Sequence, residues 1–126
     1  MDDEDIIRLI VGTMLEELGY YEEFVEECKK AVERYRSAMQ SGRPFDAAII
    51  DLTIRGNMGG TDCIKHLRAV DPGVRAIVSS GYSDDPVMSN YRELGFRGVI
   101  TKPYRIEDLS EILYKTIHGV TRYYGI

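Results

Sequence analysis

Residues 45–52 read FDAAIIDL, a short apolar run that ends in a carboxylate at Asp51. Two further apolar runs follow along the chain, RAIVSS over residues 75–80 and RGVIT over residues 97–101. Runs that lack polar alternation are typical of strands covered on both faces, and parallel sheets are built from such strands. Stretches with helical periodicity separate these runs. The pattern therefore predicts an α/β fold with a parallel sheet.

The periodicity on either side of the runs predicts the helices. Apolar residues at three- and four-residue spacing predict a helix over residues 4–18, which ends at Gly19. Four further helices are predicted in the same way, over residues 28–42, about 60–70, about 86–94 and about 106–118. The stretch YYEEFVE at residues 20–26 indicates a weak, short strand. The tail HGVTRYYGI at residues 118–126 is aromatic and β-branched, and also favours a strand.

Composition bounds the class of protein. The chain has 126 residues, 44% hydrophobic and 29% charged, which is typical of one soluble globular domain. No apolar run approaches the roughly 20 residues of a membrane-spanning helix, and acidic first residues do not form a signal peptide. A net charge of -5 argues against binding of a phosphate backbone and favours a protein partner. We expect a cytoplasmic protein without direct nucleic-acid binding or membrane insertion.

The two cysteines and the two histidines give no motif. Cys28 and Cys63 stand far apart without a CxxC spacing, which indicates neither a zinc site nor a disulfide. We interpret them as reduced, partly buried residues of a cytosolic protein. His66 and His118 are equally isolated and are expected at the surface.

Polar side chains gather where the apolar runs end. The residues at these ends are Asp51 for the first run, Ser79 and Ser80 for the second, and Thr101 and Lys102 for the third. In an open parallel sheet, ligands bind beyond the carboxyl ends of the strands. If Asp2 and Asp3 lie at the same edge, several carboxylates face one lysine. A carboxylate cluster of this kind suits Mg²⁺, and favours attack by an aspartate on phosphorus.

Four motifs in order give a family resemblance: DDE at residues 2–4, IIDLTIRGNMGG at 49–60, VSSGYS at 78–83 and ITKPY at 100–104. Together they resemble the receiver domain of two-component signalling, most closely the receivers of hybrid sensor histidine kinases. The resemblance covers nearly the whole chain, and it implies one receiver domain over residues 1–126. The implied fold is flavodoxin-like (CheY-like), a doubly wound parallel sheet with strand order 2-1-3-4-5.

The resemblance implies a role for each strand end. Asp51 matches the phosphoacceptor, which takes a phosphoryl group from a histidine kinase or a histidine phosphotransfer protein in a phosphorelay. Ser80 matches the hydroxyl that moves to the phosphoryl oxygen, and Lys102 matches the lysine that pairs with that oxygen. In the family the bond from this lysine to the following proline, here Pro103, is cis. The expected function is phosphorylation-dependent signalling that switches protein–protein contacts, rather than turnover of a free substrate.

A magnesium site is implied by the same resemblance. Asp2 and Asp3 match the acidic pair of the family, with Asp3 as the direct metal ligand in preference to Asp2. The carboxylate of Asp51 and the backbone carbonyl of Thr53 complete the protein's share of the Mg²⁺ ligands.

Two positions depart from the family pattern. Arg55 stands where the family often has proline, four residues after the acceptor. Val99 stands where an aromatic switch residue is usual, three residues before the lysine, and a valine cannot alternate between exposed and buried positions in the same way. Output would then rely on movement of residues 82–95, in which Tyr82 and Tyr91 lie.

Two other functions stay open at this point. The departures at Arg55 and Val99, and the unusual start of the chain, are compatible with a pseudo-receiver that binds a partner without being phosphorylated. A hydrolase of the haloacid dehalogenase type also uses a strand-end aspartate with magnesium. Its motif requires a second aspartate two residues later, where this chain has Thr53.

The start of the chain raises a question about the sheet. In the family the acidic pair closes the first strand, which lies in the middle of the sheet, whereas here Met1 directly precedes Asp2. The usual first strand is thus missing from the sequence. Either the natural chain has an upstream strand, or residues of about 119–125 fill the position. An exchange of this tail between two chains would make a homodimer.

Overall fold

The computed structural model describes residues 3–52, 60–81, 89–102 and 104–118. A three-stranded parallel sheet in the order β1-β2-β3 forms the centre of this part of the chain. The strands are β1 (Ala48–Asp51), β2 (Ala76–Ser80) and β3 (Gly98–Thr101). They fall inside the three apolar runs, so the predicted α/β fold with a parallel sheet is confirmed.

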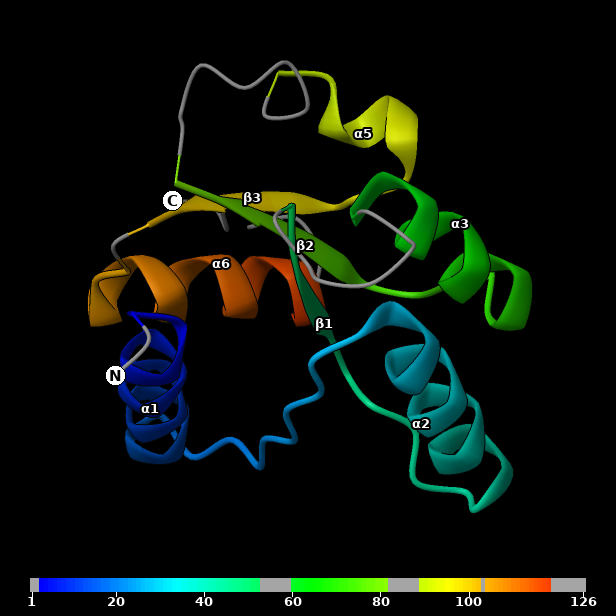
Figure 1. Cartoon of the computed structure of the whole chain (residues 1–126), viewed down its shortest axis with the longest axis horizontal. Coiled ribbons are helices and arrows are strands. Elements are labelled where there is room, and N and C mark those ends of the chain that lie inside the picture. The colour runs from blue at the N-terminus through cyan, green and yellow to red at the C-terminus, as the bar shows by residue number, and fades with distance from the viewer. Residues whose placement is uncertain (1–2, 53–59, 82–88, 103, 119–126) are drawn as a thin grey trace, which may run out of the picture.

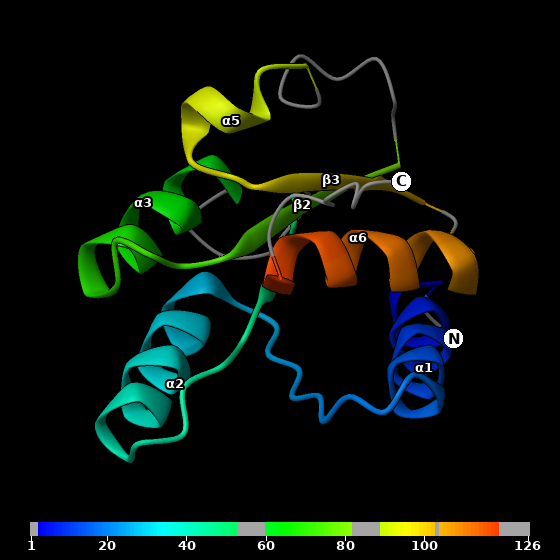
Figure 2. The same ribbon diagram turned by 180° about the vertical axis from the view of Figure 1, so that it is seen from behind.

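Helices cover both faces of the sheet (Figures 1 and 2). Their bounds are α1 (Asp3–Glu17), α2 (Cys28–Gln40), α3 (Gly60–Val70), α5 (Tyr91–Leu94) and α6 (Ile106–His118). Residues of α1 and α6 pack against one face, and residues of α2, α3 and α5 against the other. Four of the predicted helices are present near their predicted bounds. The helix predicted over residues of about 86–94 is not continuous in its described part, because Asn90 is not helical and precedes α5 as its N-cap. Residues 82–88 lie outside the described residues.

The core explains why the runs lack polar alternation. All five residues of β2 are buried. Ala76 and Val78 belong to the cluster beneath α2 and α3, whereas Ile77 belongs to the cluster beneath α1 and α6. Successive side chains of a strand point to opposite faces, so a strand covered on both sides needs apolar residues at every position until its end. Full burial of each large aliphatic side chain contributes about 1.5–3 kcal/mol.

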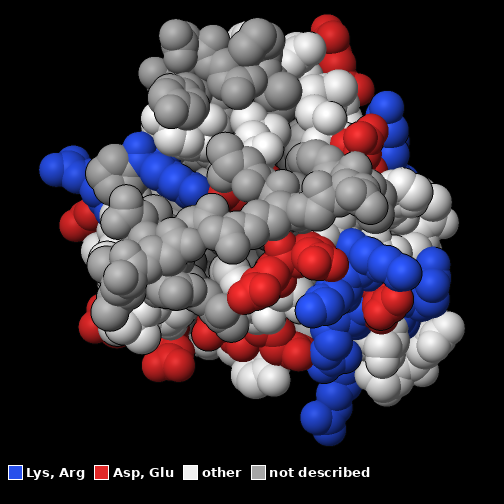
Figure 3. Space-filling view, viewed as in Figure 1, with Lys and Arg blue, Asp and Glu red and all other residues white. Residues whose placement is uncertain are grey.

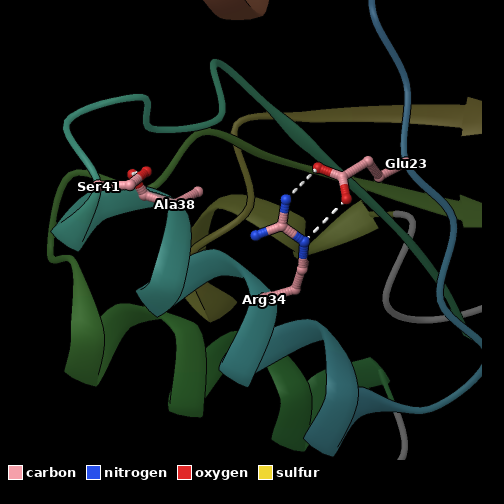
Figure 4. A network of polar contacts seen from close by, with 4 residues as sticks. All are labelled: Glu23, Arg34, Ala38 and Ser41. Atoms are coloured by element: carbon pink, nitrogen blue, oxygen red, sulfur yellow. Dashed lines mark hydrogen bonds and ion pairs between the residues drawn. The ribbon is translucent and has the colours of Figure 1, made fainter.

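The prediction of a strand at residues 20–26 is wrong. The chain between α1 and α2 is irregular there. It is attached by an ion pair instead, in which Arg34 of α2 donates two hydrogen bonds to Glu23, at 2.8 and 2.9 Å (Figure 4). Among the described residues the sheet ends at β1, so this segment has no described strand beside it. Aromatic residues and one valine favour a strand only where a neighbouring strand is present to pair with them.

The interpretation of the cysteines as reduced and only partly buried is also wrong. Cys28 and Cys63 form a disulfide with a Cα–Cα distance of 5.6 Å, and both are fully buried. They are 35 residues apart in sequence and come together because α2 packs against α3. Cysteine spacing carries no information about which helices are neighbours in space. His66 is exposed, as expected, and the side chain of His118 lies outside the described residues.

The sheet has β1 as an end strand, with β2 at its centre. This arrangement corresponds to the last three positions of the order 2-1-3-4-5. The tail at residues 119–126, which was one candidate for a strand beside β1, lies outside the described residues. Among the helices that the structure describes, none is both long and apolar enough to cross a membrane.

Candidate functional site

The three strands end at one edge of the sheet, which we call the carboxyl edge. β1 ends at Asp51, β2 at Ser80 and β3 at Thr101. In the register, Asp51 lies opposite Ser79, and Ser80 lies opposite Thr101. The ladder continues one residue past β3, because the Lys102 N–H donates to the Ser80 carbonyl at 2.9 Å. Backbone hydrogen bonds therefore fix the points at which the candidate side chains leave the sheet.

Asp51 and Lys102 are in direct contact at this edge. The Lys102 ammonium group donates a hydrogen bond to the Oδ2 atom of Asp51, and the two side chains are 19% and 34% exposed. A partly buried pair is less screened by solvent than a surface pair, and a charged donor strengthens the hydrogen bond. The carboxylate thus remains accessible at the surface while one cation is held against one of its oxygens. This arrangement suits a nucleophile that must receive a negatively charged group.

Ser80 lies at the same edge and is buried, with 1% of its surface exposed. The alternation along β2 places its side chain on the face of Val78, and that of Ser79 on the face of Ile77. The structure thus brings Asp51, Ser80 and Lys102 to one edge, as the sequence predicted.

A second polar pair, Ser79 and Tyr104, was missed by the sequence reasoning. Their hydroxyl groups are hydrogen-bonded to each other, and Ser79 is completely buried. Burial raises the pKa of Tyr104, the hydrogen bond between its hydroxyl and that of Ser79 lowers it in part, and the charge of Asp51 raises it. The Tyr104 hydroxyl is therefore close enough to Asp51 to sense its charge. The available signal was Ser79 itself, because a serine inside an apolar run needs a buried partner.

The metal ligands named from the sequence are described only in part. Asp3 is the first residue of α1, and both ribbon views show α1 beginning beside the start of α6, where β2 and β3 end (Figures 1 and 2). The side chain of Asp3 is not described, and Asp2 and Thr53 lie outside the described residues. Within the described residues, no group of three or more histidine, cysteine or acidic side chains is placed to hold a metal ion. Asp51 itself supplies the hard oxygen that Mg²⁺ prefers.

Of the two positions that depart from the family pattern, the structure describes Val99, which lies on the α2–α3 face of the sheet together with Tyr91. Val99 and Tyr91 are partly buried and pack against the cluster beneath α2 and α3. The Arg92 guanidinium lies 5.6 Å from the centre of the Tyr91 ring. Tyr91 is therefore a packing residue in this structure, and Arg55 and Tyr82 lie outside the described residues.

Comparisons with known proteins agree with this geometry. Residues 1–114 match the family model described as "Response regulator receiver domain". Sporulation initiation phosphotransferase F of Bacillus subtilis is 24% identical over 115 residues, which cover 91% of this chain and 88% of that protein. Chemotaxis protein CheY of Thermotoga maritima is 27% identical over 118 residues, which cover 91% of this chain and 92% of that protein.

Solved structures share the fold. The receiver domain of a sensor histidine kinase from Pseudomonas aeruginosa superposes with a TM-score of 0.78 at 20% identity, covering 91% of each chain. That structure has a magnesium ion coordinated in its active site cleft. At this identity the likeness shows the fold.

Proposed function

This chain belongs to the family of response regulator receiver domains, and on that premise we propose that it is a phosphoacceptor in a two-component phosphorelay. The phosphoryl group comes from a histidine of a sensor kinase or of a phosphotransfer protein, and Asp51 receives it. The observation that carries the proposal is the contact between Asp51 and Lys102 at the carboxyl edge of the sheet. A partly exposed carboxylate at this edge, with an ammonium group on one oxygen, is arranged for attack on phosphorus.

Each residue at the edge has a separate task in the transfer. A carboxylate oxygen of Asp51 forms the new O–P bond while the N–P bond to the donor histidine breaks, and the histidine nitrogen keeps the electron pair of that bond. The Lys102 ammonium compensates charge on the phosphoryl oxygens, and the Ser80 hydroxyl donates a hydrogen bond to one of them. Catalysis of phosphoryl transfer rests mainly on such positioning and charge stabilisation.

Mg²⁺ fits the residues present. The carboxylates of Asp2, Asp3 and Asp51 and the carbonyl of Thr53 are hard oxygen donors, which Mg²⁺ prefers, and the ion retains waters that a phosphoryl group can replace. When bound, the ion would offset the negative charge of the acidic cluster and of the incoming phosphoryl group. Lys102 then remains the protein's own cation at the Asp51 oxygen.

We infer a protein partner rather than a nucleic acid or a membrane. In the view of Figure 3, basic side chains gather over α2, where Lys29, Lys30, Arg34 and Arg36 are exposed, and acidic side chains lie directly beside them. A nucleic-acid footprint would need basic groups without such interspersed acids. The remaining parts of the proposal are a cytoplasmic location, a signalling rather than metabolic role, and a homodimer if the tail is exchanged between chains.

The test is labelling of the full chain with a small phosphodonor and Mg²⁺. We expect the intact mass to rise by one phosphoryl group, and the added group to be labile. Asp51→Asn is nearly isosteric and removes the nucleophile, so it should abolish labelling while circular dichroism stays unchanged. Asp46→Asn is the matched control, because Asp46 is an exposed carboxylate at the start of the same run and should label normally. Wild-type labelling of the Asp51→Asn protein would rule out this acceptor.

Magnesium separates this function from the pseudo-receiver. A metal that binds only the folded protein stabilises it by RT ln(1 + [L]/Kd), so the melting temperature should rise with Mg²⁺ concentration. An unlabelled wild-type protein whose melting temperature is indifferent to Mg²⁺ would favour the pseudo-receiver.

A further inference from the structure

The disulfide joins the beginnings of two helices on one face of the sheet. Cys28 is the first residue of α2, and Cys63 lies in the first turn of α3. Both residues are buried in the cluster that also holds Ile50 and Val78. The bond therefore lies inside the core of the α2–α3 face, beneath the strand that carries Asp51.

The bond also closes a covalent loop of the chain, and the phosphoacceptor strand β1 is part of that loop. The 35-residue separation between the cysteines includes α2, all of β1 with Asp51, and the connection from β1 to α3. That connection contains Thr53, whose carbonyl we assigned to Mg²⁺. The connection begins at the end of β1, which backbone hydrogen bonds hold to β2. It ends at the first turn of α3, which the disulfide joins to α2. When the bond is opened, the described links between α2 and the α3 region are side-chain packing and the hydrogen bond from Tyr35 to Asp71, which directly follows α3, and this hydrogen bond does not lie in the first turn of α3.

We propose that Cys28 and Cys63 form a redox-sensitive site that sets the reactivity of Asp51. The inference rests on the proposed phosphoacceptor function. In the oxidised state the disulfide fixes the end of the β1–α3 connection and keeps the acceptor edge in its reactive arrangement. In the reduced state the first turn of α3 can shift, and phosphorylation slows.

The chemistry is thiol–disulfide exchange with a low-molecular-weight disulfide. One protein thiolate attacks the small disulfide and releases one thiol. The second protein thiolate then attacks the mixed disulfide, forms the Cys28–Cys63 bond and releases the second thiol. Two protein thiols are oxidised and one small disulfide is reduced to two thiols. A dithiol reductant reverses both steps.

Two features favour a reversible site over a permanent one. Each sulfur lies in the first turn of a helix, where the positive end of the helix dipole stabilises the thiolate formed on reduction. Thiol systems of the cytoplasm, where we place this protein, supply the reductant for the reverse reaction. Because both sulfurs are buried, exchange must follow local opening, so the two states should interconvert slowly enough to be prepared separately.

The test uses the full chain in two redox states. One sample is equilibrated with oxidised glutathione and the other with dithiothreitol, and free thiols are counted by alkylation and intact mass after denaturation. The chain has only two cysteines, so no other thiol contributes. We expect no alkylated cysteine in the first sample and two in the second. With acetyl phosphate and Mg²⁺, the reduced sample should be phosphorylated at least about fivefold more slowly, within the usual range of coupling between sites.

Hydrogen exchange of the peptide covering residues 52–60 gives a readout that does not require phosphorylation. It should be faster in the reduced sample, whereas a peptide covering residues 106–118 in α6 should exchange equally in both. The control variant is Cys28→Ala with Cys63→Ala, which should behave as the reduced protein in either buffer.

The outcomes separate this inference from the proposed function. If neither redox sample is phosphorylated but hydrogen exchange of residues 52–60 differs between them, the result would support the redox site and count against the phosphoacceptor role. Equal labelling rates would overturn the inference and leave the phosphoacceptor role in place. Failure of the disulfide to form with oxidised glutathione would also overturn it.

Discussion

At the scale of single residues, the Ser79–Tyr104 pair lies beside Asp51, on the neighbouring strand and the segment after β3. Ser79 is completely buried and lies opposite Asp51 in the sheet register, and its hydroxyl is bonded to the hydroxyl of Tyr104. Tyr104 also packs into the cluster of α1 and α6. A buried hydroxyl that loses its partner retains its desolvation cost, whereas removal of both hydroxyls removes the cost as well.

We therefore predict strong coupling between substitutions at these two positions. Tyr104→Phe should lower the free energy of unfolding by about 1–3 kcal/mol, because Ser79 is left buried without its partner. Ser79→Ala should cost a similar amount, and the double variant should cost clearly less than the sum of the two. Urea denaturation of the four proteins measures this cycle. Tyr21→Phe is the control, because Tyr21 is 81% exposed. Additive costs would show that the hydroxyl groups do not interact.

Sequence reasoning at this scale succeeded where position along a strand was sufficient. Asp51, Ser80 and Lys102 each stand at or just past the end of an apolar run, and parallel strands bring such ends to one edge. Ser79 and Tyr104 were missed because their contact depends on which face of β2 each serine occupies. That choice is fixed by the packing of α6.

At the scale of elements, α2 is held to the turn between α3 and β2 by one hydrogen bond. The Tyr35 hydroxyl donates to the Oδ2 atom of Asp71 at 2.7 Å, and the Oδ1 atom of Asp71 accepts from the Gly73 N–H at 2.9 Å. Burial, followed by the hydrogen bond to Asp71 and the charge of Asp71, raises the pKa of Tyr35 well above its usual range. The folded protein therefore holds the tyrosine proton more tightly than the unfolded chain does.

This pKa shift predicts an alkaline loss of stability. The contribution of the Tyr35 hydroxyl is fully present below the unfolded pKa of about 10 and is lost as pH rises from there toward the folded pKa. Tyr35→Phe should be less stable than the wild type by about 1–2 kcal/mol at pH 8, and this difference should shrink between pH 10 and 11. Urea denaturation across this range measures it. The control Tyr21→Phe should show a small difference that does not change with pH, and a constant difference for Tyr35→Phe would contradict the argument.

Helix periodicity was a reliable guide to the elements, and α1, α2, α3 and α6 lie near their predicted bounds. Two predictions failed because they depended on neighbours. In the part of the chain that the structure describes, the segment at residues 20–26 has no adjacent strand, and Cys28 meets Cys63 through the packing of α2 on α3. Both failures have the same cause, since local composition does not determine which element lies alongside.

At the scale of the whole molecule, the free edge of β1 in the described sheet is the feature that calls for a neighbouring segment. The Ala48 N–H donates to the carbonyl of Arg75, just before β2, at 2.9 Å, and the Leu52 N–H donates to the carbonyl of Ser79 in β2 at 3.0 Å. Backbone groups alternate in direction along a strand, so those of Ile49 point away from β2, where the described sheet has no further strand. Parallel strands at the centre of a covered sheet rarely leave such groups unpaired. Local sequence does not show which segment pairs with such an edge, because strand pairing depends on residues that are distant along the chain.

We predict that the tail at residues 119–126 takes part in covering this edge, within one chain or exchanged between two. Removal of residues 119–126 should lower the melting temperature or convert a dimer to a monomer, because strand pairing and apolar contact are lost together. Calorimetry and light scattering after gel filtration measure the two effects. Val120→Pro tests pairing in the full-length chain, since proline cannot donate a ladder hydrogen bond, and Val120→Ala is the matched control. A shortened chain with unchanged melting temperature and unchanged mass in solution would exclude the tail, and would leave the β1 edge to be covered by another segment.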